Sequence, residues 1–164
     1  MRFKDKANRS GGFFRLNIVE EHNGEKKIVG DSGWKPNMIT NLGAQYYIID
    51  LMLGSAGSMR VGYAGLGSGG AVLSADTNIS NPCATNRNSF TISGATVASR
   101  TLRYIGTLQS NVYASTTIGN VGLFSDSATS NASGSMFAGN TFTSSTLATN
   151  QAVNLTYDIQ FATS

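Results

Sequence analysis

Alternating apolar and polar residues along much of the chain predict a protein built mainly from short β-strands. The clearest alternation runs over residues 151–162, where apolar side chains occupy every second position: Val153, Leu155, Tyr157, Ile159 and Phe161. Because successive side chains of a strand point to opposite faces of a sheet, this spacing indicates a strand with one buried face. Weaker patterns of the same kind predict strands over residues 59–66, 89–97, 101–108, 117–124 and 136–142.

The N-terminal part of the chain predicts a β-hairpin. Residues 13–21 alternate between apolar and polar side chains, and residues 26–30 form the expected returning strand. Between the two segments lies Asn23-Gly24. This pair suits a type I′ turn, because both central residues of that turn have positive φ.

One helix is predicted near residues 41–53. Apolar residues recur there at helical spacing along one face: Leu42, Tyr46, Ile49 and Leu53. Thr40 or Asn41 is the expected N-cap, and Gly54 is the expected stop. Just before this segment, Pro36 is expected to interrupt regular structure.

These elements together predict a mainly β fold, an antiparallel β-sandwich of the jelly-roll type with one helix near residues 41–53. We expect residues 1–35 to form an N-terminal arm with the hairpin, and residues 36–164 to form the sandwich body. The length of 164 residues fits one such domain. The sequence leaves the order of the strands in the sheets open.

Charged residues are concentrated in the N-terminal fifth of the chain. Residues 1–35 hold eight Lys or Arg and five Asp or Glu, whereas residues 36–164 hold four of each kind. A soluble domain normally has about a quarter charged residues, and interfaces are depleted in Lys, Glu and Asp. The body, rich in Ser, Thr, Asn and Gly, therefore predicts a surface covered by neighbouring subunits. The alternative is the Ser- and Thr-rich surface of a secreted-type β-protein.

Membrane and nucleic-acid partners are not expected. No stretch approaches the roughly 20 apolar residues that span a bilayer, and no secretion signal is expected. Basic residues near the N-terminus could contact phosphates, but Glu20, Glu21, Glu25 and Asp31 interrupt them.

Residue types needed for catalysis or metal binding are sparse. The single histidine, His22, lies beside the predicted hairpin turn, and the single cysteine is Cys83. Histidine is the commonest general base, and zinc sites need clustered Cys and His. Residues 65–70, GLGSGG, match the pattern G-x-G-x-x-G, but no helix is predicted directly after them. We therefore expect no enzymatic activity, no metal and no cofactor.

The order of several segments resembles small structural proteins of tailed-bacteriophage particles. These segments are GWKPNMITNLG at 33–43, YAGLGSG at 63–69, IGNVGLF at 118–124, MFA at 136–138, and the closing strand at 153–161. Two positions depart from the pattern of that family. Asn120 stands in place of the usual acidic residue, and Tyr157 stands in place of the usual Trp, and both fit packing roles.

The resemblance implies a non-catalytic virion protein that assembles through protein–protein contacts in the host cytoplasm. A tail-fibre or tail-appendage adaptor is preferred, and a capsid decoration (cement) protein is the alternative. A carbohydrate-binding β-sandwich is the alternative of another class. The expected partners are copies of the chain, as a trimer or ring, and other capsid or tail proteins. The expected interface residues, with Trp34 as the main anchor, are Phe13, Phe14, Leu16, Ile18, Trp34, Tyr46 and Tyr47.

Overall fold

A computed structural model describes residues 10–49, 60–84, 87–89, 91–96, 101–108, 113, 116–127 and 136–161. The described chain is mainly β, and all of its strand pairs are antiparallel, which confirms the predicted fold class. The strands are β1 (Ser10–His22), β2 (Glu25–Asp31), β3 (Lys35–Ile39), β4 (Tyr63–Gly67), β5 (Asn88–Ser89), β6 (Thr91–Thr96), β7 (Thr101–Leu108), β8 (Thr117–Phe124), β9 (Met136–Thr146) and β10 (Gln151–Phe161).

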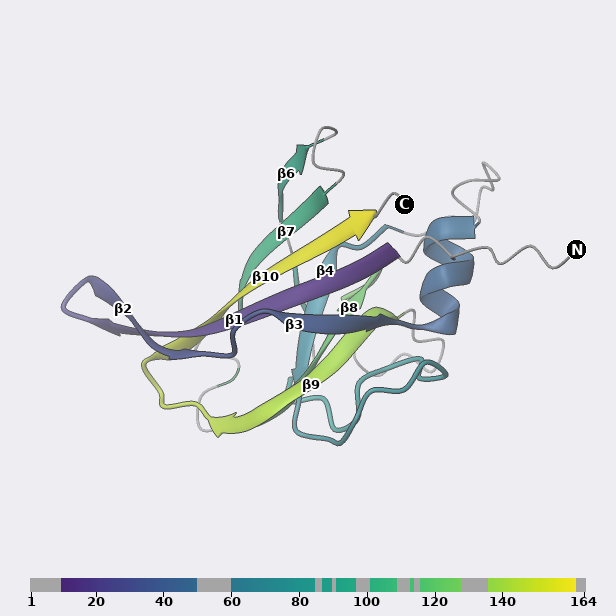
Figure 1. Cartoon of the computed structure of the whole chain (residues 1–164). Coiled ribbons are helices and arrows are strands. Elements are labelled where there is room, and N and C mark those ends of the chain that lie inside the picture. The colour runs from purple at the N-terminus through teal and green to yellow at the C-terminus, as the bar shows by residue number, and fades with distance from the viewer. Residues whose placement is uncertain are drawn as a thin grey trace, which may run out of the picture.

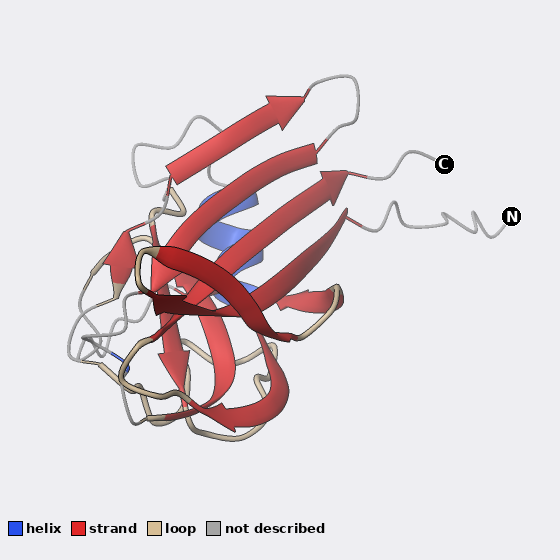
Figure 2. Ribbon diagram, turned by 90° about the vertical axis from the view of Figure 1, so that its left-hand side faces the viewer, coloured by secondary structure: helices blue, strands red, loops and turns tan. Residues whose placement is uncertain are grey.

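The strands follow the order β5-β4-β8-β9-β3-β1-β10-β7-β6, with β2 also paired to β1. β3 joins the two halves, because it pairs with β1 through residues 35–37 and with β9 through Met38 and Ile39. At the other side, β5 pairs with β4 and the closely following β6 pairs with β7. The two ends of the sheet therefore come together, and the sandwich is nearly closed into a barrel (Figures 1 and 2).

The first strand is part of the body and not an addition to it. β1 pairs with β10 from Ser10 to Glu20, and Phe14 and Leu16 are buried in the main core. We expected residues 1–35 to form an arm apart from the body at 36–164. In the structure, the strand that begins at Ser10 already belongs to the body. The apolar face of β1 accounts for this difference, because it is stable only when it is buried against the other strands. Residues 1–9 lie outside the described part of the chain.

The predicted hairpin turn is confirmed. Asn23 and Gly24 connect β1 to β2 and have φ values of 51° and 82°. Positive φ at both positions fits the type I′ turn that Asn-Gly favours. The turn end of this hairpin extends away from the rest of the sandwich (Figure 1).

The sequence did not predict β3, because it contains Pro36. Pro36 lies opposite Phe13 of β1, whereas β9 pairs with β3 only further along, at Met38 and Ile39. Proline has no N–H to donate to a ladder, and it is tolerated where a strand has a free edge. The divergence of β9 from β3 gives Pro36 such an edge.

The predicted helix is shorter in the described residues and of a different type. Residues 41 and 42 are α-helical and lead into a π-helix, η1 (Gly43–Ile49), and residues 50–53 of the predicted helix lie outside the described residues. Thr40 is its N-cap, because the Thr40 hydroxyl accepts a hydrogen bond from the Gly43 N–H at 2.9 Å. Tyr47 is buried against Phe137, with ring centroids 5.1 Å apart.

Two buried polar side chains hold the long connection between β4 and β5 against the sandwich. Arg87 forms an ion pair with Asp126 at 2.6 Å, and its guanidinium lies 3.5 Å from the ring centroid of Phe124. Burial lowers the pKa of Arg87, and the Asp126 carboxylate opposes that shift. Asn120 donates to the Ser80 carbonyl at 3.2 Å, which the carboxylate expected at this position from the phage resemblance could not do.

The contact between Gly12 and Tyr157 fixes how β1 packs on the core. Tyr157 is fully buried, and its hydroxyl accepts a hydrogen bond from the Asn37 amide at 2.7 Å. A Cβ atom at Gly12 would overlap with that hydroxyl. Glycine at position 12 therefore provides the space for the Tyr157 ring between β1 and β3.

We predict that Gly12→Ala lowers the free energy of unfolding by about 1–3 kcal/mol, because the added methyl group overpacks the core. Denaturant unfolding followed by circular dichroism measures this change. Gly62→Ala is the matched control, because a Cβ atom there meets nothing within 4 Å. Equal stability of the two variants would contradict the packing described for Tyr157.

Candidate assembly surface

Several apolar side chains are exposed on the outer face of the β3–β1–β10–β7 sheet. Phe13 lies opposite both Pro36 and Asp158, and Ile105 lies opposite Thr156, so these residues share one face. We call this region, defined by Phe13, Trp34, Met38 and Ile105, the outer face. These four side chains are between 36% and 45% exposed, and they are not part of the core.

Trp34 reaches across this face towards β7. Its ring centroid lies 5.8 Å from the Arg103 guanidinium carbon, although β1 and β10 lie between β3 and β7 in the sheet. Both side chains therefore lie along the outer face. A cation over a Trp ring at this distance contributes about 0.5–1 kcal/mol at an exposed site.

Arg103 is held by an ion pair with Asp158. The two residues are directly opposite on β7 and β10. The guanidinium donates twice to the carboxylate, at 2.7 Å and 2.6 Å, and these hydrogen bonds raise the pKa of Arg103. This two-point geometry fixes the plane of the guanidinium, and the charges of both residues neutralise each other beside Trp34.

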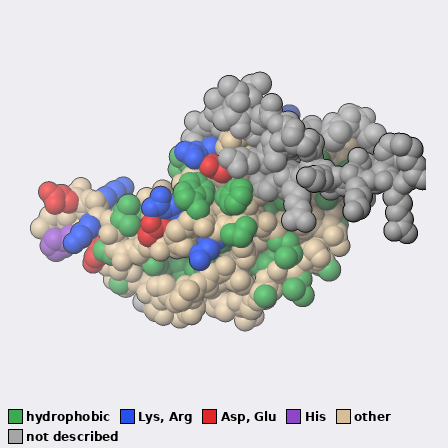
Figure 3. Space-filling model, in the orientation of Figure 1, with side chains coloured by type: hydrophobic (Ala, Val, Ile, Leu, Met, Phe, Trp, Pro, Cys, Tyr) green, Lys and Arg blue, Asp and Glu red, His purple; other side chains and the backbone are tan. Residues whose placement is uncertain are grey.

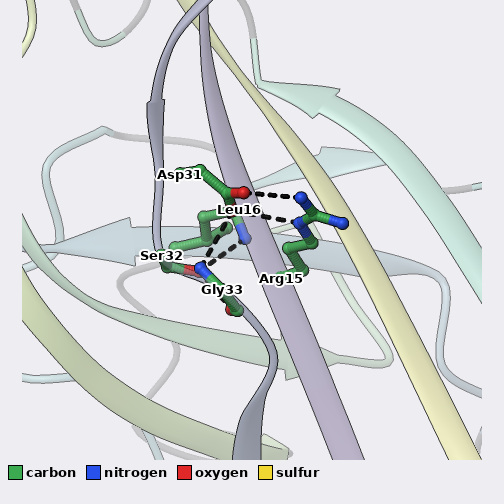
Figure 4. Close-up of polar contacts among 5 residues, drawn as sticks. All are labelled: Arg15, Leu16, Asp31, Ser32 and Gly33. Carbon is green, nitrogen blue, oxygen red and sulfur yellow. Dashed lines mark hydrogen bonds and ion pairs between the residues drawn. The ribbon is translucent and has the colours of Figure 1, made fainter.

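A second ion pair fixes the turn that precedes Trp34 (Figure 4). The Arg15 guanidinium donates to both oxygens of Asp31, at 3.0 Å and 2.5 Å, and the Gly33 N–H donates to Asp31 at 2.9 Å. The Ser32 hydroxyl accepts from the Leu16 N–H at 2.9 Å. These bonds join the turn to β1, and Gly33 adopts a φ of 64° there.

Ion pairs neutralise part of the charge in the described part of the body. Of the eight charged residues in 36–164, four are joined in two ion pairs, Arg87–Asp126 and Arg103–Asp158. Hydrophobic side chains gather over β10, β1 and β3, with Lys or Arg and Asp or Glu side chains at their border (Figure 3). A patch with this composition fits protein contact better than exposure to water.

The residues that the sequence indicated as an interface divide into two groups. Phe13 and Trp34 are exposed on the outer face, where a partner can reach them. Phe14, Leu16 and Tyr47 are buried in the core, and Ile18 and Tyr46 are partly buried against it. Core packing within the subunit thus accounts for Phe14, Leu16 and Tyr47, which are not available to a partner.

Sequence reasoning did not identify Ile105, Met38 or the two ion pairs of the outer face. The alternation in residues 101–108 could have placed Ile105 on the other face of the strand from its buried neighbour Tyr104. The sequence does not indicate which charged residues pair with each other, because Arg103 and Asp158 are 55 positions apart.

The single histidine and Asp76 of the long connection lie apart from the outer face. His22 is exposed at the end of β1, and Asp76 accepts a hydrogen bond from the Leu73 N–H at 2.8 Å. Within the described residues, no three His, Cys, Asp or Glu side chains cluster to hold a metal, and no helix is long and apolar enough to cross a membrane.

Comparison with known proteins found no match, either among protein-family models, among curated proteins or among solved structures. The resemblance to phage virion proteins therefore stays a prediction from the residues that carry it.

We predict that Asp31 titrates with a pKa of about 2, because the Arg15 guanidinium and then the Gly33 N–H stabilise its carboxylate. The contribution to stability is present above the ordinary Asp value of 3.8 and is lost as the pH falls through about 2. Carbon-13 NMR of the carboxyl group measures this pKa, and Arg15→Met should raise it. An ordinary pKa in the unaltered protein would show that the turn is not fixed in this way.

Proposed function

We propose that the chain is a non-catalytic structural component of a tailed-bacteriophage particle that functions by assembling with other virion proteins. The observation that carries the proposal is the outer face, where Trp34 is exposed among apolar side chains and the charges of Arg15 and Arg103 are paired with Asp31 and Asp158. The centres of protein interfaces are enriched in aromatic residues and depleted in charged ones. The ordered segments at 33–43, 63–69 and 118–124 support the phage class.

A tail-fibre or tail-appendage adaptor is the preferred position on the particle. The chain combines a sandwich with a projecting hairpin, and such a shape can contact two neighbours at once (Figure 1). Capsid decoration is the alternative, since a chain of 164 residues is also suited to coating a capsid. In either position the expected partners are copies of the chain, as a trimer or ring, and capsid or tail proteins.

Carbohydrate binding is the second candidate class. Trp34 is 45% exposed beside the planar guanidinium of Arg103, and a flat aromatic surface bordered by polar groups can stack on a sugar ring. Binding of the isolated protein to a glycan array, abolished by Trp34→Ala, would favour this class over assembly.

Particles provide the test of the assembly role. We predict that the protein co-purifies with phage particles on a density gradient and that quantitative mass spectrometry finds it at a fixed copy number. Tens of copies would support the tail position, and hundreds would support capsid decoration. Absence of the protein from purified particles would overturn the proposal.

A single substitution tests the role of the outer face. We predict that Trp34→Ala reduces the number of copies per particle at least ten-fold, because losing a central aromatic contact costs about 2 kcal/mol or more of binding energy. Leu73→Ala is the matched control, because Leu73 is an exposed apolar residue outside this face. Equal losses for both variants, or none for Trp34→Ala, would contradict a specific role for the outer face.

A further inference from the structure

The sandwich is open at one end, between β9 and the chain segment that runs from β2 into β3. β9 pairs with β3 only at Ala138 and Gly139. From Thr141 to Thr146, β9 pairs only with β8 among the described strands. The two diverging segments enclose an open cavity of about 310 Å³, which we call the wedge.

The wedge has an apolar floor and a polar rim. Its floor is formed by inward-facing side chains of four strands: Leu16, Ile18, Ile118, Phe142 and Val153. Its rim is formed by the turn after β2 and by the far half of β9: Gly30, Asp31, Ser32, Lys35, Thr143, Ser144 and Ser145. An apolar floor that opens between two strands matches the side chains of an additional strand.

Both strands that border the wedge have a free edge. β2 pairs only with β1 among the described strands, and the far half of β9 pairs only with β8. Backbone N–H and C=O groups along such an edge are a template for another strand. A row of backbone donors and acceptors beside an apolar floor recognises an extended chain better than a small compact ligand.

The projecting hairpin has the properties of a strand that could fill this site. Its β2 strand exposes Ile28 (60%) and Val29 (44%), which gain nothing from exposure to water. The hairpin end also has a free edge of its own and extends beyond the sandwich (Figures 1 and 3). The described part of the chain therefore contains both an exposed apolar strand and a place for one that no described strand fills.

We propose that the hairpin of a second copy of this chain enters the wedge and adds its β2 strand to the free edge of β9. The proposal rests on the assembly role and names the contact through which copies associate. Exchange of hairpins around a closed ring, or between two copies, leaves no wedge empty.

The charges of the two surfaces are complementary. The hairpin end has Glu20, Glu21 and Glu25 against Lys26 and Lys27, so it is negative by one charge. At the wedge, Asp31 is already paired with Arg15, and Lys35 has no ion-pair partner among the described residues. Lys35 thus gives the rim one uncompensated positive charge, which attracts the acidic hairpin and would not select an uncharged small molecule.

Mixed cross-linking of the full-length protein tests the proposal. Two preparations, each with Cys83→Ser, are made with tags of different size, one with Ile28→Cys and the other with Thr143→Cys. After mixing and mild oxidation, non-reducing gel electrophoresis should show the mixed dimer, whose disulfide can form only between copies. The control partner is Leu73→Cys, which places an exposed cysteine away from the wedge. Ser145→Cys, two positions along β9, is the second wedge position and allows for a different register.

At least ten-fold more mixed dimer with Thr143→Cys or Ser145→Cys than with Leu73→Cys is the expected result. Mixed dimer no greater than the Leu73→Cys control at both wedge positions, with every variant folded by circular dichroism, would overturn the proposal. This experiment tests hairpin exchange separately from the assembly role, because the assembly role is tested by the presence of the protein in particles. Cross-links without particle incorporation would leave hairpin exchange standing and remove the phage role, and the reverse result would remove hairpin exchange alone.

Discussion

The structure depends on the pairing of its first described strand with its last. β1 and β10 are antiparallel neighbours from Ser10 to Glu20, and their inner side chains, including Leu16 and Leu155, lie in the main core. The buried Tyr157 hydroxyl then joins this pair to Asn37 of β3, which connects to the other half of the sandwich. Without the β1–β10 pair, the two halves would lose both their shared core and their connection.

The same strand pair determines what the protein presents to its surroundings. Because Phe14 and Leu16 point inward, Phe13 and Arg15 necessarily point outward, where Arg15 fixes the turn before Trp34. β1 also continues past its pairing with β3 into the projecting hairpin with β2, and the wedge opens where β9 diverges from β3. The candidate assembly surface and the open end are thus two results of one arrangement.

Local patterns in the sequence predicted the local structure well. They did not predict which strands pair or which side chains become buried. The weaker patterns at 101–108 and 117–124 predicted the bounds of β7 and β8, and Asn23-Gly24 predicted the turn, because each depends on neighbouring residues alone. Pro36 concealed β3, since its tolerance depends on where β9 diverges. For the site, Trp34 is exposed and its role as an anchor stays a prediction, and alternation cannot say which face of a strand becomes buried. Phe14 and Leu16 were therefore grouped with Phe13.

The central claim is that a neighbouring protein covers the outer face in the assembled particle. Hydroxyl-radical footprinting with mass spectrometry measures this directly, by comparing the oxidation rate of Trp34 in the free protein and in purified particles. The account predicts at least a ten-fold slower rate at Trp34 in particles, with Leu73, which is exposed elsewhere, as the internal reference. An unchanged rate at Trp34 relative to Leu73 would show that this face stays open to water and would contradict the account.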